Sequence, residues 1–243
     1  MNVCDVKVAV LIPDRGDRPK FLAQCLAMMH RQTLQPVHIE LVNDTAMSNA
    51  VDITWRYRVG YKRISSFGSA QDDTPFDVIA FIENDDWYHP QYLENMVEAW
   101  LKVGQPDMLG LDHTVYYHIA ERAWFTMHHH TRSSAMNTLI KPNLDIEWPL
   151  DYDPYTDVWL WTRECFVPQI EKNIRGVRYP MPGKAIIGSN FEWCVGIKHG
   201  TGLCGGKNHT DNLHRYVHKD GDGAWLRQVA GEEDAAFYLQ PIT

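Results

Sequence analysis

Apolar runs and polar turns alternate regularly over the first hundred residues. Three short, mainly apolar runs are expected to be buried strands of a parallel sheet: residues 6–12, 38–42 and 77–82. The segments that follow have apolar positions at helical spacing and are expected to be helices: residues 19–29, 46–63 and 90–101. This alternation predicts an α/β fold with a Rossmann-like, mostly parallel central sheet flanked by helices.

The pattern becomes mixed after Gly104. Short strands are expected at residues 108–112, 123–127, 133–140 and 191–198, and helices at residues 156–165 and 223–239. The sequence contains no repeat, low-complexity tract or clear linker. We therefore expect a single domain of residues 1–243, built from a first half, residues 1–104, and a mixed second half, residues 105–243.

Charge and composition limit which kinds of molecule the protein is expected to bind and where it is expected to be located. The formal net charge of -8 argues against a dominant, sequence-independent grip on nucleic acid, which needs a basic excess. A local basic patch is still available at residues 128–132 or 198–209. The 5 cysteines are odd in number, form no CxxC pair and follow no leader, so reduced thiols and a cytoplasmic location are expected. No stretch is apolar enough to span a bilayer.

Acidic and amide side chains follow all three predicted strands of the first half. They are Asp14, then Asn43 and Asp44, then the run Glu83-Asn84-Asp85-Asp86. Ligands of such sheets bind at the carboxyl ends of the strands. Three carboxylates in four residues repel one another unless a proton or cation joins them, and Mg²⁺ and Mn²⁺ prefer carboxylate oxygens. The alternative is a solvated turn in which Asp86 caps the following helix.

Two segments in order resemble the family-2-type glycosyltransferases of the GT-A fold. The first comprises Leu11-Ile12-Pro13, Arg18-Pro19 and Val42-Asn43-Asp44. The second is Phe81-Ile82-Glu83-Asn84-Asp85-Asp86-Trp87, followed by Pro90 and by Leu93-Glu94. The resemblance covers roughly residues 6–200 and is densest before residue 101. The loop at residues 14–18 is one residue longer than usual, and Glu83 replaces the usual first aspartate.

The resemblance implies a GT-A fold with a smaller, mixed acceptor-side part. It also implies inverting transfer of a hexose or pentose from a nucleotide-diphosphate sugar, UDP-linked, to an acceptor hydroxyl. A divalent cation, Mn²⁺ or Mg²⁺, is expected on Asp85 with Glu83, Asp86 and His199, for which His209 is a rival. The residues expected to contact the nucleotide are Pro13, Asp14, Arg15, Asn43, Asp44, Arg58 and Asn84. For Arg58, a solvated position on an amphipathic helix is the simpler alternative.

A weaker resemblance concerns the second half. Thr156-Asp157-Val158-Trp159-Leu160-Trp161-Thr162-Arg163 is similar to the family segment Glu-Asp-x-x-Leu-Trp-x-Arg, with threonine in place of the glutamate. The resemblance implies that Asp157 is the general base, whereas the alternative is that Asp157 only caps a helix.

The acceptor is expected to be a glycan or a hydroxymethylated base of DNA. Trp87, His130, Arg132 and Trp159 are the side chains expected to contact it. The triplet of residues 128–130 is a poor zinc site, because adjacent side chains on a strand point to opposite faces and only His128 and His130 can share a ligand.

Two other functions are compatible with these patterns. Substitutions at Glu83 and Thr156 leave room for a protein that binds a nucleotide sugar without turnover. A nucleotidyltransferase also places acids at strand ends, but it needs a glycine-rich basic loop after the first strand. The loop at residues 14–18 contains one glycine, which disfavours that function.

Overall fold

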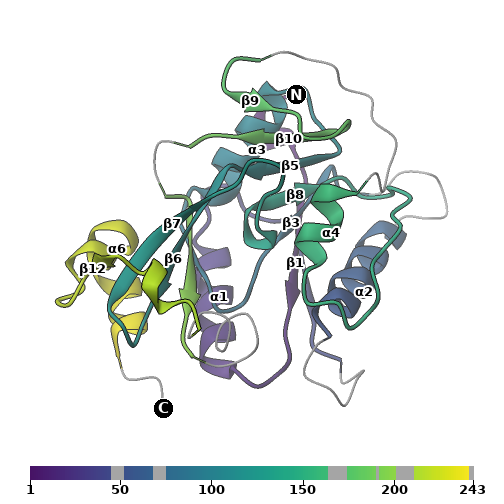
Figure 1. Ribbon diagram of the computed structural model, residues 1–243. Coiled ribbons are helices and arrows are strands. Elements are labelled where there is room, and N and C mark those ends of the chain that lie inside the picture. Colours follow the sequence, from purple (N-terminus) through teal and green to yellow (C-terminus); the bar gives the residue numbers. More distant parts are fainter. Residues whose placement is uncertain (45–51, 68–74, 164–173, 190–191, 201–210, 241–243) are drawn as a thin grey trace.

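The computed structural model describes residues 1–44, 52–67, 75–163, 174–189, 192–200 and 211–240 (Figure 1). A seven-stranded sheet, ordered β2-β1-β3-β8-β5-β10-β9, consists of β1 (Val8–Pro13), β2 (His38–Val42), β3 (Val78–Phe81), β5 (Met108–Leu111), β8 (Thr138–Ile140), β9 (Val177–Arg178) and β10 (Lys184–Ile187). A five-stranded sheet, ordered β12-β7-β6-β11-β4, consists of β4 (Trp87–Tyr88), β6 (His113–His118), β7 (Ala123–His128), β11 (Cys194–Lys198) and β12 (His218–Lys219). The described helices are α1 (Pro19–His30), α2 (Ile53–Ser66), α3 (Tyr92–Lys102), α4 (Thr156–Thr162) and α6 (Ala224–Leu239), with short 3-10 turns at Val3–Asp5, Ala135–Asn137 and Leu213–Arg215.

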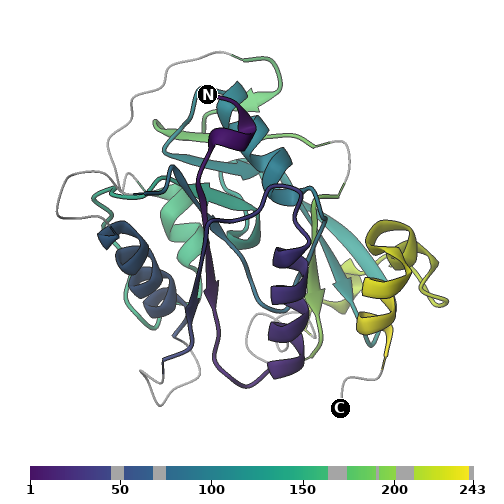
Figure 2. The same ribbon diagram turned by 180° about the vertical axis from the view of Figure 1, so that it is seen from behind.

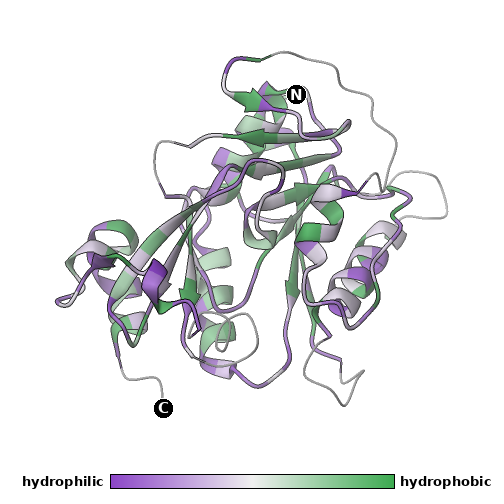
Figure 3. Cartoon of the chain, in the orientation of Figure 1, coloured by the Kyte–Doolittle hydropathy of each residue, from purple (hydrophilic) through white to green (hydrophobic). Residues whose placement is uncertain are grey.

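Strand β1 lies inside the larger sheet and is buried on both faces. Val8, Val10 and Ile12 pack in a core with α1 and α3, whereas Ala9 and Leu11 pack in a second core with α2 and α4. The front and back views show these helix pairs on opposite sides of the sheet (Figures 1 and 2). Burial on both faces explains why the strand is apolar throughout, while α2 mixes hydrophobic and hydrophilic positions (Figure 3).

Helix α2 packs closely on the sheet because of one glycine. A Cβ atom at Gly60 would lie 2.8 Å from Cγ2 of Val42 and 2.9 Å from Cδ1 of Leu11. The helix continues past Gly60 to Ser66, so the glycine does not end it. Its position in the sequence is therefore explained by packing.

The mixed α/β fold with a largely parallel central sheet is confirmed. Strands β1, β2, β3, β5 and β10 run in one direction, and β8 and β9 run in the other. The strand expected at residues 133–140 is shorter than predicted, because Ala135–Asn137 form a 3-10 turn before β8. Strand β8 lies antiparallel between β3 and β5 and so links the two halves of the sequence within one sheet.

Helix α6 closes one side of the smaller sheet. It is interrupted at Gly231, whose φ of 78° and ψ of 164° lie in a region open to glycine and not to other residues. Beyond this break, Ala235 and Tyr238 pack into the same core as α1 and the smaller sheet. The break therefore lets residues 232–239 pack onto the core, where the hydroxyl of Tyr238 donates a hydrogen bond to the backbone carbonyl of Asp86.

Two further expectations from the sequence concern membrane-spanning segments and the state of the cysteines. Within the described ranges, no helix has both the length and the apolar character needed to cross a bilayer. Cys4, Cys25 and Cys194 are free thiols, while Cys165 and Cys204 lie outside the described residues.

Candidate functional site

Because β1, β2 and β3 are parallel, the predicted polar residues that follow them lie at the same, C-terminal, end of these strands. Pro13 at the end of β1 is in register with Val42 of β2, and Leu11 is in register with Phe81 of β3. The acidic run therefore follows β3 beside the loops that follow β1 and β2. One carboxylate oxygen each from Glu83, Asp85 and Asp86 lies within 4.8 Å of the others.

Asp86 is completely buried, and among the described residues only one of its two carboxylate oxygens has a hydrogen-bond partner. Its Oδ1 accepts a 2.7 Å hydrogen bond from the backbone N–H of Ile197, whereas Oδ2 is buried without a hydrogen-bond partner among the described residues. Burial raises the pKa of Asp86 well above its usual range, against the opposing charge of Lys198. A buried oxygen without a partner is costly, so Oδ2 fits a site for a cation. Asp86 does not cap a helix, because β4 follows it and α3 begins only at Tyr92.

Asp85 is the most strongly paired of the three carboxylates. Its Oδ2 accepts a hydrogen bond from Arg18 Nη1 and lies 2.8 Å from His199 Nε2. Burial alone would raise its pKa, but the charge of Arg18 and the contact with His199 hold the pKa below its ordinary value. Asp85 is therefore held as a carboxylate, with Arg18 as its counter-ion. The structure thus places His199 beside Asp85, and its rival His209 lies outside the described residues.

Lys198 supplies a buried positive charge that the sequence analysis did not assign to the site. It is 5% exposed, and its ammonium lies 4.9 Å from the centre of the Tyr116 ring. Burial opposes its charge, but Asp86 and Tyr116 outweigh burial and raise its pKa. Lys198 thus remains protonated beside the carboxylates. The sequence signal was its place in an apolar strand directly before His199.

Asp14 and Asn84 form the inner part of the predicted nucleotide edge. Asn84 Nδ2 donates a 2.6 Å hydrogen bond to Asp14 Oδ1, and both side chains are buried. Arg56 of α2 donates to the carbonyl oxygens of Asp14 and Val42 and pairs with Asp52 at 2.6 Å. Arg56 therefore fixes the ends of two strands, a role that the sequence analysis missed.

The prediction for Arg58 does not fit the geometry. Arg58 donates two hydrogen bonds to Asp151, at 2.8 and 2.7 Å, and so ties α2 to the segment before α4. The two arginines lie two residues apart on one helix and therefore point in different directions. The one that reaches the strand ends is Arg56.

The remaining predicted nucleotide residues lie at the outer part of the edge. Asn43 and Asp44 are exposed, and Asp44 pairs with Arg63 at 2.8 Å. The hydrogen bond from Arg63 lowers the pKa of Asp44. Arg15 pairs with Asp17 at 2.8 Å in the loop after β1.

Asp157 faces a cavity of about 370 Å³ that also reaches the acidic run. The side chains that line the cavity include Glu83, Tyr116, Arg132, Ser134, Asp157, Lys198 and Arg215. Arg132 Nη1 donates a 2.9 Å hydrogen bond to Asp157 Oδ2. Burial raises the pKa of Asp157, and the positive charge of Arg132 opposes that rise. A carboxylate of raised pKa in a cavity is suited to accept a proton.

Thr156, which stands where the family has a glutamate, has a structural contact. Its hydroxyl is hydrogen-bonded to the hydroxyl of Thr54, and both residues are buried. The contact joins the start of α4 to the start of α2. It thereby fixes the first turn of α4, which carries Asp157.

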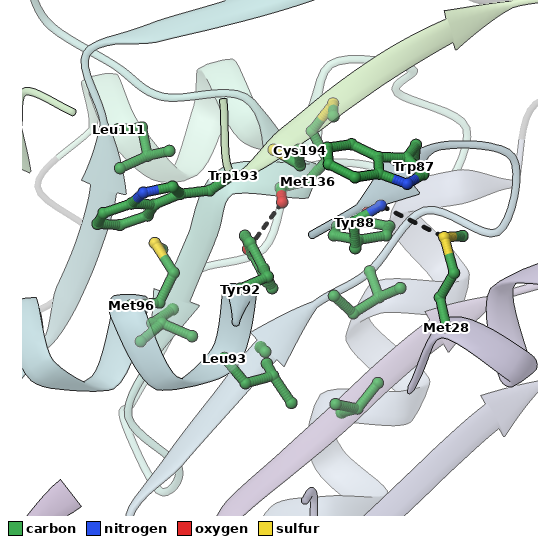
Figure 4. Close-up of a cluster of buried hydrophobic side chains, with 14 of the residues drawn as sticks. Met28, Trp87, Tyr88, Tyr92, Leu93, Met96, Leu111, Met136, Trp193 and Cys194 are labelled. Atoms are coloured by element: carbon green, nitrogen blue, oxygen red, sulfur yellow. Dashed lines mark hydrogen bonds between the residues drawn. The ribbon is translucent and has the colours of Figure 1, made fainter. Parts of the chain in front are cut away.

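Trp87 was wrongly predicted to contact the acceptor. It is 1% exposed and its indole N–H donates a 3.0 Å hydrogen bond to Asp234 of α6. It packs in the core near Met28, Tyr88 and Tyr92 (Figure 4). Strand β4 pairs with β11, and this pairing turns the ring inward.

Of the other predicted acceptor residues, only Arg132 lines the cavity. Trp159 donates to the carbonyl of Glu147 at 2.8 Å and stacks with Arg163. His130 and His128 are exposed while His129 is buried, although β7 ends at His128 and the other two histidines follow the strand. His129 contacts Thr114 and Ser134 through its ring nitrogen, at 3.1 and 3.2 Å.

Comparison with known proteins identifies the fold. No protein-family model and no curated protein matches the chain. Among solved structures it is similar to residues 1–349 of TarS from S. aureus in complex with UDP-GlcNAc, with a TM-score of 0.50 and 12% identity, over 81% of this chain and 60% of that one. It also matches a glycosyltransferase involved in the glycosylation of the major capsid of PBCV-1, with a TM-score of 0.34 and 8% identity, over 56% and 60% of the two chains.

The likeness to TarS supports the predicted α/β fold of the GT-A-like class. The chain spans 60% of the length of that TarS fragment. At 12% identity the likeness extends to the fold and leaves the site to be argued from this chain's own residues.

Proposed function

We propose that the protein is an inverting glycosyltransferase that moves a sugar from a nucleotide-diphosphate sugar, UDP-linked, to an acceptor hydroxyl. The observation that carries the proposal is that Glu83 of the acidic run and Asp157 of α4 line one cavity. A candidate cation ligand and a candidate base thus line the same space of about 370 Å³. The likeness of the fold to a protein solved with UDP-GlcNAc supports a nucleotide sugar as the donor.

The donor would lie along the carboxyl edge of β1, β2 and β3. Asp14, Asn43 and Asp44 would contact its base and ribose there, with Pro13 and Asn84 beside them. Asp85, Asp86 and Glu83 would hold Mn²⁺ or Mg²⁺, which, when bound, neutralises charge on the departing diphosphate. The buried, unpartnered Oδ2 of Asp86 supports this assignment.

Asp157 would accept the proton of the acceptor hydroxyl. As the O–H bond breaks, the acceptor oxygen forms a bond to the anomeric carbon, and the bond from that carbon to the diphosphate oxygen breaks on the opposite face. The configuration is inverted and the diphosphate leaves with the electron pair. Lys198, which stays protonated at this cavity, would stabilise the charge that develops on the leaving group.

The acceptor in this proposal is a glycan or a hydroxymethylated base of DNA. Arg132 and Arg215 line the cavity beside Asp157. Guanidinium groups bind phosphate in a fork-like geometry, which favours an acceptor with a phosphate near its reactive hydroxyl, as in DNA. Because the whole chain has a net charge of -8, such binding would depend on this local group of cations.

Arg132 should set the pH at which Asp157 works as a base. Because Arg132 lowers the pKa of Asp157, Arg132→Gln should raise that pKa. Less of the carboxylate is then ionised at acidic pH, so the acid limb of the pH profile of kcat/KM should move to higher pH. Arg132→Lys keeps the charge and should move the limb less. An acid limb that stays in place in Arg132→Gln would show that Asp157 is not the base that titrates.

A further inference from the structure

Arg18 occupies an unusual position for an arginine beside a candidate metal site. It lies directly before α1, and its Nη1 donates to Asp85 Oδ2 and lies 3.1 Å from His199 Nε2. The two atoms that it touches, Asp85 Oδ2 and His199 Nε2, are 2.8 Å apart. One nitrogen of the guanidinium therefore contacts both.

The same two atoms form a natural pair of ligands for a divalent cation. Carboxylate oxygens and imidazole nitrogens bind such ions at about 2.0–2.2 Å, which a pair separated by 2.8 Å allows. The unpartnered Oδ2 of Asp86 lies in the same group of carboxylates. Arg18 Nη1 and a cation on Asp85 and His199 would therefore occupy the same space, and their positive charges would repel each other.

Arg18 has few other bonds to hold it there. Its Nε has no hydrogen bond among the described residues and approaches only the half-exposed Asp17, at 3.4 Å. The side chain is long, and 17% of its surface is exposed. The guanidinium can therefore leave Asp85 without breaking a second strong contact. Guanidinium groups bind phosphate well, and the donor proposed above carries two phosphates beside this site.

We propose that Arg18 is an exchangeable counter-ion of Asp85. Its guanidinium holds the carboxylate while no divalent cation is bound, leaves when the cation binds, and then pairs with the diphosphate of the donor. This inference rests on the proposed function for the identity of the donor. Its consequence is thermodynamic coupling: the nucleotide holds the displaced Arg18, so nucleotide and cation each increase the affinity for the other.

The test is a titration with Mn²⁺, followed by the electron paramagnetic resonance signal of the free ion, without nucleotide and with saturating UDP. Without nucleotide, Arg18→Gln should bind Mn²⁺ about 10-fold more tightly than the wild type, because the competing charge is gone. Arg18→Lys, with a more compact charge, should lie between the two. Arg227→Gln is the matched control, since it removes one positive charge from a residue that pairs with Glu232 on α6, and should bind like the wild type.

Saturating UDP should raise the Mn²⁺ affinity of the wild type and raise that of Arg18→Gln by a smaller factor. Equal or weaker Mn²⁺ binding by Arg18→Gln without nucleotide would overturn the proposal, as would an unchanged effect of UDP. Should Arg18→Gln not fold, the same comparison is made with Arg18→Lys, which must then bind Mn²⁺ more tightly than the wild type. Absence of Mn²⁺ binding by every variant would also overturn this proposal. The proposed function is tested separately, by measuring transfer of sugar to an acceptor.

Discussion

Asp157→Asn should lower the rate of sugar transfer by a factor of about 10² to 10⁴ at saturating donor and acceptor, the usual cost of losing a general base. Asparagine keeps the size of the side chain and can still accept a hydrogen bond from Arg132, but it cannot take a proton. Affinity for the nucleotide sugar should barely change, because in the proposed arrangement Asp157 of α4 contacts the acceptor and not the diphosphate. The measurement pairs a transfer assay with a binding titration on this one variant.

Asp153→Asn is the matched control for this variant. Asp153 Oδ1 accepts a hydrogen bond from the backbone N–H of Tyr155 at 2.8 Å, and Asp151 is paired with Arg58. Neither carboxylate is among the side chains that line the cavity, so Asp153→Asn should transfer sugar at the wild-type rate. If Asp157→Asn does so as well, the base lies elsewhere. If Asp157→Asn instead loses nucleotide binding, the proposed division between donor and acceptor residues is wrong.

Asp85→Asn should lower turnover by a factor of about 10² or more, because it removes a proposed ligand of the cation that would neutralise the charge developing on the diphosphate. It should also abolish tight binding of Mn²⁺. Asp85 is buried, so the variant leaves Arg18 without its ion-pair partner and should lose on the order of 3 kcal/mol of stability. Assays therefore have to be run well below the melting temperature of the variant.

Glu232→Gln is the control for the loss of one negative charge, because Glu232 is exposed and pairs only with Arg227 among the described residues. It should keep full activity. Full activity of Asp85→Asn would contradict a role for the acidic run in binding a cation. Unaltered activity of the wild type in excess EDTA would contradict it as well.

The first half of the fold could be predicted closely because β1 and β3 are buried throughout and the helices are strongly periodic. Strand β2 has the predicted bounds, β3 is one residue shorter than predicted at each end, and α1 is one residue longer at its C-terminal end. Strand β6 was missed because it carries histidine, threonine and tyrosine, whose polar atoms bind within the protein, as Thr114 does to Ser134. Strand β4 is two residues long and forms because it pairs with β11. A pairing between residues so far apart in the sequence is not indicated by any local pattern.

The sequence predicted site residues best where they are close together along the chain. The acidic run could be found as a run, and the family resemblance added His199 to it, but Arg18 was not predicted as its partner. Arg18 and His199 are 67 and 114 residues away from Asp85, and only the folded chain brings them to one carboxylate oxygen. Trp87 shows the opposite error, since proximity in sequence suggested a role at the site and β-sheet pairing placed the ring in the core.

The central claim, transfer of a sugar from a nucleotide sugar, is tested most directly with UDP-sugars that carry one label in the sugar and another in the uridine. Glycans and hydroxymethylated DNA are offered as acceptors in the presence of Mn²⁺. We expect the sugar label to enter one acceptor while the uridine label is released as UDP in equal amount, and Asp157→Asn to suppress both. Uridine label in the product would indicate a nucleotidyltransferase, and bound donor without release would indicate a binding protein. Either result, or no binding of any UDP-sugar, would contradict the proposed function.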